Sequence, residues 1–276
     1  MKTQPNKAYL FDVDGVLTDP EALRIKQPAL IDELIKRLHH GNAVGFNTGL
    51  SLKNMEERVL RYIEKKVKDK QLLQNIIVIA EKGGESLTYD EKGNAKKRID
   101  ETIHVPQALQ DDVKELLTNP QYSEILQLNT TKYTMLTVYI RPKEERKATF
   151  EDFLKAQEAF AKETQKLINQ HDLQDDFLVD KTTVAIDIES KRVGKGYGAR
   201  KFVEILEKRG IMPHEYICFG DSPSDYAMYE AFKQLGKQLT FVFVREKKYL
   251  EGKDVTDVIF THQQADKGTL EYLQRE

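Results

Sequence analysis

Cysteine, tryptophan and long apolar runs are scarce or missing in this chain of 276 residues. Its one cysteine, Cys218, excludes an intrachain disulfide framework and a cysteine-built zinc site, and it favours a reducing, cytoplasmic compartment. Because tryptophan is absent, any surface that stacks on a sugar would need Tyr or Phe. No apolar run approaches the roughly 20 residues of a membrane span, and residues 1–7 lack the apolar core of a signal peptide. We therefore expect neither a membrane segment nor a secretory leader.

An excess of charge of one sign is also missing. The chain has 43 Lys and Arg against 45 Asp and Glu, a formal net charge of −2. Such a balance supplies no global basic field that would collect nucleic acid or an anionic membrane, so we expect neither as a partner. Hydrophobic residues make up 39% and charged residues 32%, which is typical of a globular protein with one large domain or two ordinary ones.

Strand and helix signals alternate in the first 83 residues and again after residue 190. Apolar runs predict buried strands at residues 9–11, 43–46, 76–80, 216–219, 239–244 and 255–260. Helical spacing, caps and glycine stops predict helices over residues 28–40, 51–68, 196–209, 225–235 and from about 267. This alternation is typical of βαβ units around a parallel sheet.

Residues 84–189 show a different pattern of strand and helix signals. We expect a hairpin over residues 86–98, a helix after Pro106, a long charged helix over 146–171, and strands at 125–128, 133–140, 177–179 and 183–188. Hairpins mixed with helices indicate an α+β unit. The sequence thus predicts an α/β fold: a Rossmann-like parallel-sheet core of residues 1–83 and 190–276, with an α+β cap domain inserted over residues 84–189.

Two aspartates directly follow the first predicted strand. Asp12 and Asp14 are spaced i, i+2, and Gly15 marks the turn away from the strand. Open α/β sheets bind their ligands outside the carboxyl ends of the strands, so both carboxylates can face one site. Close carboxylates repel each other unless a cation compensates. The pair therefore predicts a Mg²⁺ site, a nucleophile paired with an acid/base, or both.

Three further segments place polar residues at strand ends or helix starts. Thr48 and Gly49 offer a hydroxyl and backbone N–H groups that can bind phosphate oxygens. Lys195, at a helix start, is a compact positive charge, and the loop after residue 219 adds Asp221 and Asp225. Taken singly, each residue has an ordinary explanation as a helix cap or a solvated charge. Their shared placement favours a single pocket.

In these four segments the chain resembles the haloacid dehalogenase (HAD) superfamily of aspartate-nucleophile phosphotransferases. The matching segments are Phe11-Asp-Val-Asp-Gly-Val-Leu-Thr18, Asn47-Thr-Gly49, Gly194-Lys-Gly196 and Gly220-Asp-Ser-Pro-Ser-Asp225. By position and size, the insertion is similar to the large C2-type cap of this superfamily. The resemblance extends to its sugar-phosphate phosphatases, such as those for trehalose phosphate, sucrose phosphate and mannosyl-phosphoglycerate.

The resemblance implies a role for each aspartate. Asp12 would be the nucleophile that forms an aspartyl-phosphate. Asp14 would protonate the leaving alkoxide and then activate water; its presence favours a phosphatase over a dehalogenase. Mg²⁺ would be held by the Asp12 carboxylate, the backbone carbonyl of Asp14 and Asp221, with Asp225 in support.

The same resemblance implies that Thr48, Gly49 and Lys195 bind the phosphoryl oxygens, with Thr48 and Lys195 part of the catalytic set. The chain departs from the capped relatives in one respect. Many of them have an arginine after the Thr-Gly pair, where this chain has Leu50. Any substrate contact of that arginine would need another residue.

Two other cations are candidates for substrate contacts. Lys82 follows the third predicted strand, and Arg141 follows a cap strand. The sequence as a whole predicts a Mg²⁺-dependent phosphomonoester hydrolase that acts on a small phosphorylated metabolite, expected to be a sugar phosphate. Two alternatives stay open: a phosphomutase of the same superfamily, and a catalytically idle phosphate-binding regulatory protein.

Overall fold

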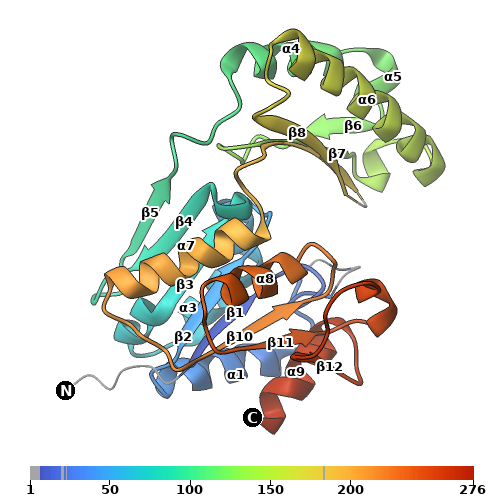
Figure 1. Ribbon diagram of the computed structural model, residues 1–276. Helices are drawn as coiled ribbons and strands as arrows, with labels where there is room; N and C mark the ends of the chain where they lie inside the picture. The colour runs from blue at the N-terminus through green and yellow to red at the C-terminus, as the bar shows by residue number, and fades with distance from the viewer. Residues whose placement is uncertain (1–6, 20–21, 23, 183) are drawn as a thin grey trace. The chain divides into compact units, whose positions relative to one another are not determined.

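The chain forms two compact units in the computed structural model, which describes residues 7–19, 22, 24–182 and 184–276 (Figure 1). The larger unit comprises Met1–Arg98 and Gly194–Glu276, and the smaller unit comprises Ile99–Val193. The polypeptide thus passes between the units at two points, as expected for one domain inserted into another.

An eight-stranded sheet forms the centre of the larger unit, in the order β12-β11-β10-β1-β2-β3-β4-β5. The six strands from β12 to β3 are parallel, whereas β4 runs antiparallel to β3. The predicted parallel sheet is therefore confirmed. The strands are β1 (Lys7–Phe11), β2 (Ala43–Asn47), β3 (Ile76–Ala80), β4 (Glu85–Tyr89), β5 (Ala95–Ile99), β10 (Glu215–Gly220), β11 (Leu239–Phe243) and β12 (Val258–Phe260).

Helices cover both faces of this sheet (Figure 1). Along β1, Tyr9 and Phe11 point into a core with α1, α2, α3 and α9, while Ala8 and Leu10 point into a core with α7 and α8. Burial on both faces explains why the central strands are continuous apolar runs. The helical segments are α1 (Pro28–His39), α2 (Leu52–Met55), the π-turn η1 (Glu56–Leu60), α3 (Arg61–Lys66), α7 (Lys195–Lys208), α8 (Tyr226–Gln234), α9 (Ala265–Arg275) and the short 3₁₀ segments η2 (Lys70–Asn75), η3 (Glu81–Gly83) and η5 (Lys247–Leu250).

The smaller unit is an antiparallel sheet with helices packed on one face. Its strand order is β6-β7-β9-β8, and its core combines Val138 and Ile186 of the sheet with Phe153 and Phe160 of the long helix α6. The bounds are α4 (Gln107–Leu117), α5 (Pro120–Ser123), β6 (Leu126–Leu128), β7 (Leu136–Ile140), the 3₁₀ segment η4 (Lys143–Glu145), α6 (Phe150–Gln170), β8 (Phe177–Lys181) and β9 (Ala185–Ser190). In the described part of the chain, no helix has the length and apolar character that crossing a membrane demands.

The hairpin expected over residues 86–98 lies in the larger unit, where β4 and β5 extend the large sheet. The predicted cap domain begins at residue 84, whereas the smaller compact unit begins at Ile99 and ends at Val193 rather than at residue 189. The reason is that the tight turn Glu81–Gly83 returns the chain alongside β3, with Ala80 opposite Glu85. The change in sequence pattern at residue 84, from alternating strands and helices to a hairpin, thus marks a switch from parallel to antiparallel pairing within one sheet.

Candidate active site

Three adjacent central strands bring the candidate residues to one edge of the large sheet. Asp12 follows β1, Thr48 follows β2 and Asp221 follows β10, and β1 lies between the other two strands. Backbone hydrogen bonds hold these strand ends: Asp12 N donates to Phe219 O at 3.0 Å, and Thr48 N donates to Ile79 O at 2.9 Å. The carboxyl edge of the sheet therefore carries the site, as the parallel topology requires.

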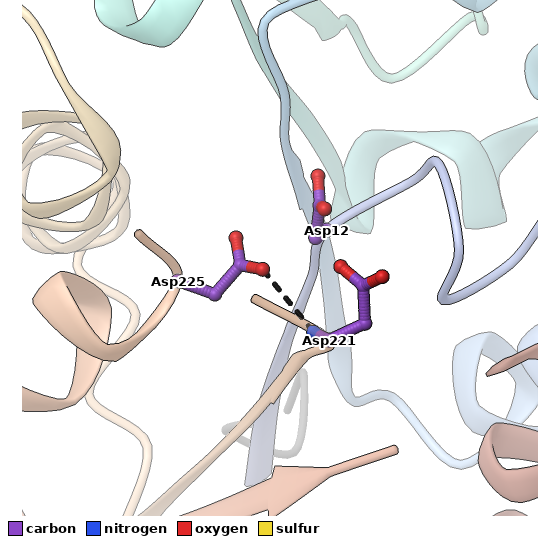
Figure 2. Close-up of side chains that lie close together, drawn as sticks. All are labelled: Asp12, Asp221 and Asp225. Carbon is purple, nitrogen blue, oxygen red and sulfur yellow. Dashed lines mark hydrogen bonds between the residues drawn. The ribbon is translucent and has the colours of Figure 1, made fainter. Parts of the chain in front are cut away.

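Three carboxylates cluster at this edge. Carboxylate oxygens of Asp12, Asp221 and Asp225 lie within 4.8 Å of one another (Figure 2). The second carboxylate oxygen of Asp225, Oδ2, accepts hydrogen bonds from Asp221 N at 3.1 Å, Ser222 N at 3.1 Å and Ser222 Oγ at 2.7 Å. Asp225 therefore shapes the loop that presents Asp221, besides contributing its own charge.

Lys195 supplies the positive charge in this cluster. Its Nζ lies 2.5 Å from Asp12 Oδ1 and 2.7 Å from Asp225 Oδ1, and the Lys195 side chain is only 9% exposed. The residue opens helix α7 after Gly194, whose φ of +146° is a conformation that side-chain-bearing residues rarely adopt. Nζ also donates to Asn47 O at 3.0 Å, which ties the lysine to the strand that carries Thr48.

The electrostatics of the cluster show an excess of negative charge. Burial and the Asp225 carboxylate raise the pKa of Asp12 well above its usual range, although the nearby Lys195 ammonium opposes the shift. Burial and Asp225 also raise the pKa of Asp221, to about 6, against the opposing effect of Lys195 and Arg245. Lys195 forms ion pairs with two of the three carboxylates, those of Asp12 and Asp225. This buried set of hard oxygen donors with uncompensated charge fits a divalent cation such as Mg²⁺.

Asp14 has different partners. Its Oδ1 accepts hydrogen bonds from Thr18 Oγ1 at 3.1 Å and from Arg58 Nη1 at 2.9 Å. The Asp14 side chain is 39% exposed, in contrast to Asp12 at 12%. The two aspartates of the Asp-x-Asp segment therefore occupy distinct environments: Asp12 is buried against a lysine, and Asp14 is half-exposed and held by an arginine.

Gly15 is required by the close packing of this loop. Its φ is +79°, and a Cβ at this position would lie 2.5 Å from Asp221 Oδ2. Any side chain would therefore both strain the backbone and displace the Asp221 carboxylate.

The Thr48-Gly49 loop packs against Lys82. Lys82 N donates to Thr48 O at 2.9 Å, and a Cβ on Gly49 would lie 3.6 Å from Lys82 Cε. Thr48 is buried, and its Oγ1 accepts a hydrogen bond from Leu50 N at 3.1 Å. Lys82 itself has a φ of +54°, an uncommon conformation for lysine that is typical of functional loops. The structure thus brings Lys82 beside the predicted phosphate loop.

Arg141 belongs to the smaller unit. Its Nε donates to Ser123 O at 2.7 Å, and its guanidinium lies 3.6 Å from Glu145 Oε2. These contacts brace the end of β7, and a contact of Arg141 with substrate stays a prediction.

Sequence reasoning gave no role to three residues that the structure places at the site: Asn47, Thr18 and Arg58. Asn47 and Thr18 stand within the segments that carry the family resemblance, so motif position could have singled them out. Arg58 had no such signal, because it lies on a charged helical stretch 44 residues from its partner Asp14.

In a parallel sheet covered by helices on both faces, ligands bind outside the carboxyl ends of the strands, which is where the acidic cluster lies. Residues 10–235 match the family model of haloacid dehalogenase-like hydrolases, and the chain belongs to this family. It is accordingly a hydrolase, and the predicted superfamily and α/β fold are confirmed. No curated protein matches the chain by sequence.

Solved structures share the fold along nearly the whole chain. Trehalose-6-phosphate phosphatase from Aspergillus fumigatus is 16% identical, with a TM-score of 0.57, over 99% of this chain and 93% of that one. Sucrose-phosphatase from Synechocystis sp. PCC6803 is 14% identical, with a TM-score of 0.55, over 98% of both chains. A haloacid dehalogenase-like hydrolase from Bacteroides thetaiotaomicron is 12% identical, with a TM-score of 0.65, over 98% of both chains. At such identities the likeness concerns the fold.

Proposed function

We propose that this protein is a Mg²⁺-dependent phosphomonoester hydrolase that works through an aspartyl-phosphate on Asp12. The observation that carries the proposal is the buried contact of Lys195 Nζ with Asp12 Oδ1, at 2.5 Å, within a cluster of three carboxylates. A lysine beside a buried aspartate provides the positive charge that a transferring phosphoryl group needs as it approaches the nucleophile.

The reaction would proceed in two displacements. In the first, an Asp12 carboxylate oxygen attacks phosphorus, the bond from phosphorus to the leaving oxygen breaks, and Asp14 gives that oxygen a proton. In the second, Asp14 takes a proton from water, the water oxygen attacks phosphorus, and the bond from Asp12 to phosphorus breaks. Inorganic phosphate leaves, and both aspartates return to their starting states.

The surrounding groups would stabilise charge. Mg²⁺ would be held by Asp12 and Asp221, with Asp225 in support and the Asp14 carbonyl as a further ligand, and it would neutralise phosphate charge and orient the phosphoryl group. Lys195 would offset the charge that the equatorial oxygens gain, and Thr48 and Gly49 would offer hydrogen-bond donors to the same oxygens. Phosphoryl transfer depends mainly on such positioning and electrostatics.

A sugar phosphate is the substrate class that we favour, with the smaller unit acting as the cap. One face of its sheet packs on the helices, so the alternating residues of β7 and β9 belong to the other face. On that face Thr137 Oγ1 donates to Asp187 Oδ1 at 2.5 Å, Lys132 lies 3.4 Å from Asp187, and Asp180 and Glu189 add carboxylates. Charged and hydroxyl groups of this kind suit the hydroxyls of a sugar. The phosphatases of trehalose 6-phosphate and sucrose phosphate that share the fold agree with this class.

Phosphate release tests the proposal. Purified protein with Mg²⁺ should release inorganic phosphate from 4-nitrophenyl phosphate and from members of a sugar-phosphate panel. Asp12→Asn should abolish turnover while the far-UV circular dichroism spectrum stays unchanged, because Asn cannot form the acyl phosphate. Asp32→Asn, an exposed position on α1, is the matched control and should keep full activity. Undiminished turnover by Asp12→Asn would contradict the mechanism. Phosphate released in proportion to substrate lost separates a hydrolase from a phosphomutase.

A further inference from the structure

Arg58 is the residue that holds Asp14. Its Nη1 donates to Asp14 Oδ1 at 2.9 Å, and Thr18 Oγ1 donates to the same oxygen at 3.1 Å. The Arg58 side chain is 24% exposed, so the ion pair is partly shielded from water. Charge-assisted hydrogen bonds of this length are among the stronger polar contacts in proteins. Two donors on one oxygen fix the rotation of the Asp14 carboxyl group.

The helix that carries Arg58 is built irregularly at this residue. The π-turn η1 (Glu56–Leu60) separates α2 from α3, and Arg61 N donates to Glu56 O across five residues. Such π-turns occur often at functional sites because the wider turn changes which side chains share a face. Here it allows two consecutive residues, Val59 and Leu60, to be fully buried while the preceding Arg58 reaches Asp14.

We propose that Arg58 is a positioning residue for the acid/base step: with Thr18 it fixes Asp14 Oδ1, and so leaves Oδ2 to exchange the proton with the leaving group and then with water. This inference rests on the proposed function, since it assigns Asp14 the proton transfers. Within the described part of the chain, the hydrogen bonds to the Asp14 carboxyl all end on Oδ1. The proton passes from Oδ2 to the leaving oxygen as its bond to phosphorus breaks, and returns to Oδ2 from the attacking water.

The dependence on leaving group tests this role. An alkoxide needs a proton in order to leave, whereas 2,4-dinitrophenolate is stable without one. For glycerol 2-phosphate, Arg58→Met should lower kcat/KM by about 10- to 100-fold, through kcat with KM nearly unchanged. For 2,4-dinitrophenyl phosphate it should lower kcat/KM by less than about 3-fold, because kcat/KM reports the first displacement and this leaving group needs no proton there. Arg58→Lys should recover part of the loss, because a cation can still reach Oδ1. Arg61→Met is the matched control, since Arg61 lies one turn later and contacts Tyr62 instead.

A double-mutant cycle with Asp14 completes the test. In the Asp14→Asn background, Arg58→Met should change kcat by less than about 2-fold, because its effect passes through the Asp14 carboxyl. Equal losses of kcat/KM on both substrates, a rise in KM for glycerol 2-phosphate with kcat retained, or full additivity with Asp14→Asn would each overturn the positioning role. If the wild-type protein turns over neither substrate, the proposed function fails and the role of Arg58 fails with it. Turnover that is insensitive to Arg58→Met overturns the role of Arg58 alone.

Discussion

Two reciprocal hydrogen bonds join Asn47 and Lys195, each from the side chain of one residue to the backbone carbonyl of the other. Asn47 Nδ2 donates to Lys195 O at 2.8 Å, and Lys195 Nζ donates to Asn47 O at 3.0 Å. The two residues are 148 positions apart in the chain. Their reciprocal contact joins the end of β2 to the start of α7, and it sets where the lysine ammonium meets Asp12. The position of the Lys195 ammonium in the carboxylate cluster thus depends on an amide from another motif.

Removal of the lysine charge should cost both activity and stability. Lys195→Met leaves Asp12 and Asp225 buried without their cation, and breaking a buried ion pair from one side costs about 3–5 kcal/mol. The free energy of unfolding, measured by urea titration at pH 7, should fall accordingly, and kcat/KM should fall by about 10²- to 10³-fold. Lys208→Met, an exposed change at the end of the same helix, should alter neither. Wild-type stability in Lys195→Met would contradict the buried ion pair.

Gly198 should be intolerant of alanine. A Cβ at this position would lie 2.1 Å from Asn47 Oδ1, so Gly198→Ala would push the amide away from Lys195 O. Within a helix, alanine normally stabilises by about 1 kcal/mol over glycine, but here we expect a lower melting temperature. The cost of Gly198→Ala should shrink when Asn47→Ala is also present. An equal drop in melting temperature in both backgrounds would show that the Asn47 amide is not the source of the strain.

Gly15 should be needed for the metal as well as for the backbone. Gly15→Ala meets a φ of +79° and places Cβ 2.5 Å from Asp221 Oδ2. The Mg²⁺ concentration for half-maximal activity should therefore rise by about 10-fold, the effect of roughly 1.4 kcal/mol in binding.

Gly236→Ala separates the two effects, because Gly236 has a φ of +64° with no heavy atom within 4 Å of the added Cβ. Both variants should lose about 1 kcal/mol of unfolding free energy, because alanine is strained in the left-handed conformation. Only Gly15→Ala should change the Mg²⁺ requirement. An equal shift in both variants would show that backbone strain alone is responsible.

Glu85 should make stability depend on pH. Burial and the neighbouring Glu81 carboxyl raise the pKa of Glu85 from 4.5 to about 7, against the opposing charge of Lys97. Between these two pH values the folded protein binds more protons than the unfolded chain. The free energy of unfolding should therefore fall as pH rises from 4.5 to 7, by on the order of 2 kcal/mol.

Glu85→Gln removes this contribution, so its unfolding free energy should fall less steeply than that of the wild type over the same window and exceed it at pH 8. Glu91→Gln, an exposed change in the following turn, should follow the wild-type curve. Urea unfolding at several pH values measures the difference. A wild-type curve that rises through this window would contradict the raised pKa of Glu85.

Much of the fold could be predicted because local patterns suffice for it. Ile76–Ala80 is an apolar run typical of a strand buried on both faces, and the structure has β3 with those bounds. The hairpin at β4 and β5 was predicted as a hairpin, but its membership of the large sheet was not. Pairing between Ala80 and Glu85 depends on a turn through residues with positive φ at Glu81 and Lys82, which propensity does not favour.

The candidate site likewise has features that could be predicted from the sequence and features that could not. The residues that gather at the sheet edge could be predicted from the order of strands and motifs, since parallel strands place Asp12, Thr48 and Asp221 at one end. The contacts of the two aspartates in Asp12-Val-Asp14 could not be predicted in this way, because they depend on how distant segments pack. Lys195 Nζ contacts Asp12 directly, while the Asn47 amide holds the Lys195 backbone, and Arg58 reaches Asp14 from a π-turn. Contacts between side chains far apart in the chain depend on packing, and packing leaves no periodic signal in the sequence.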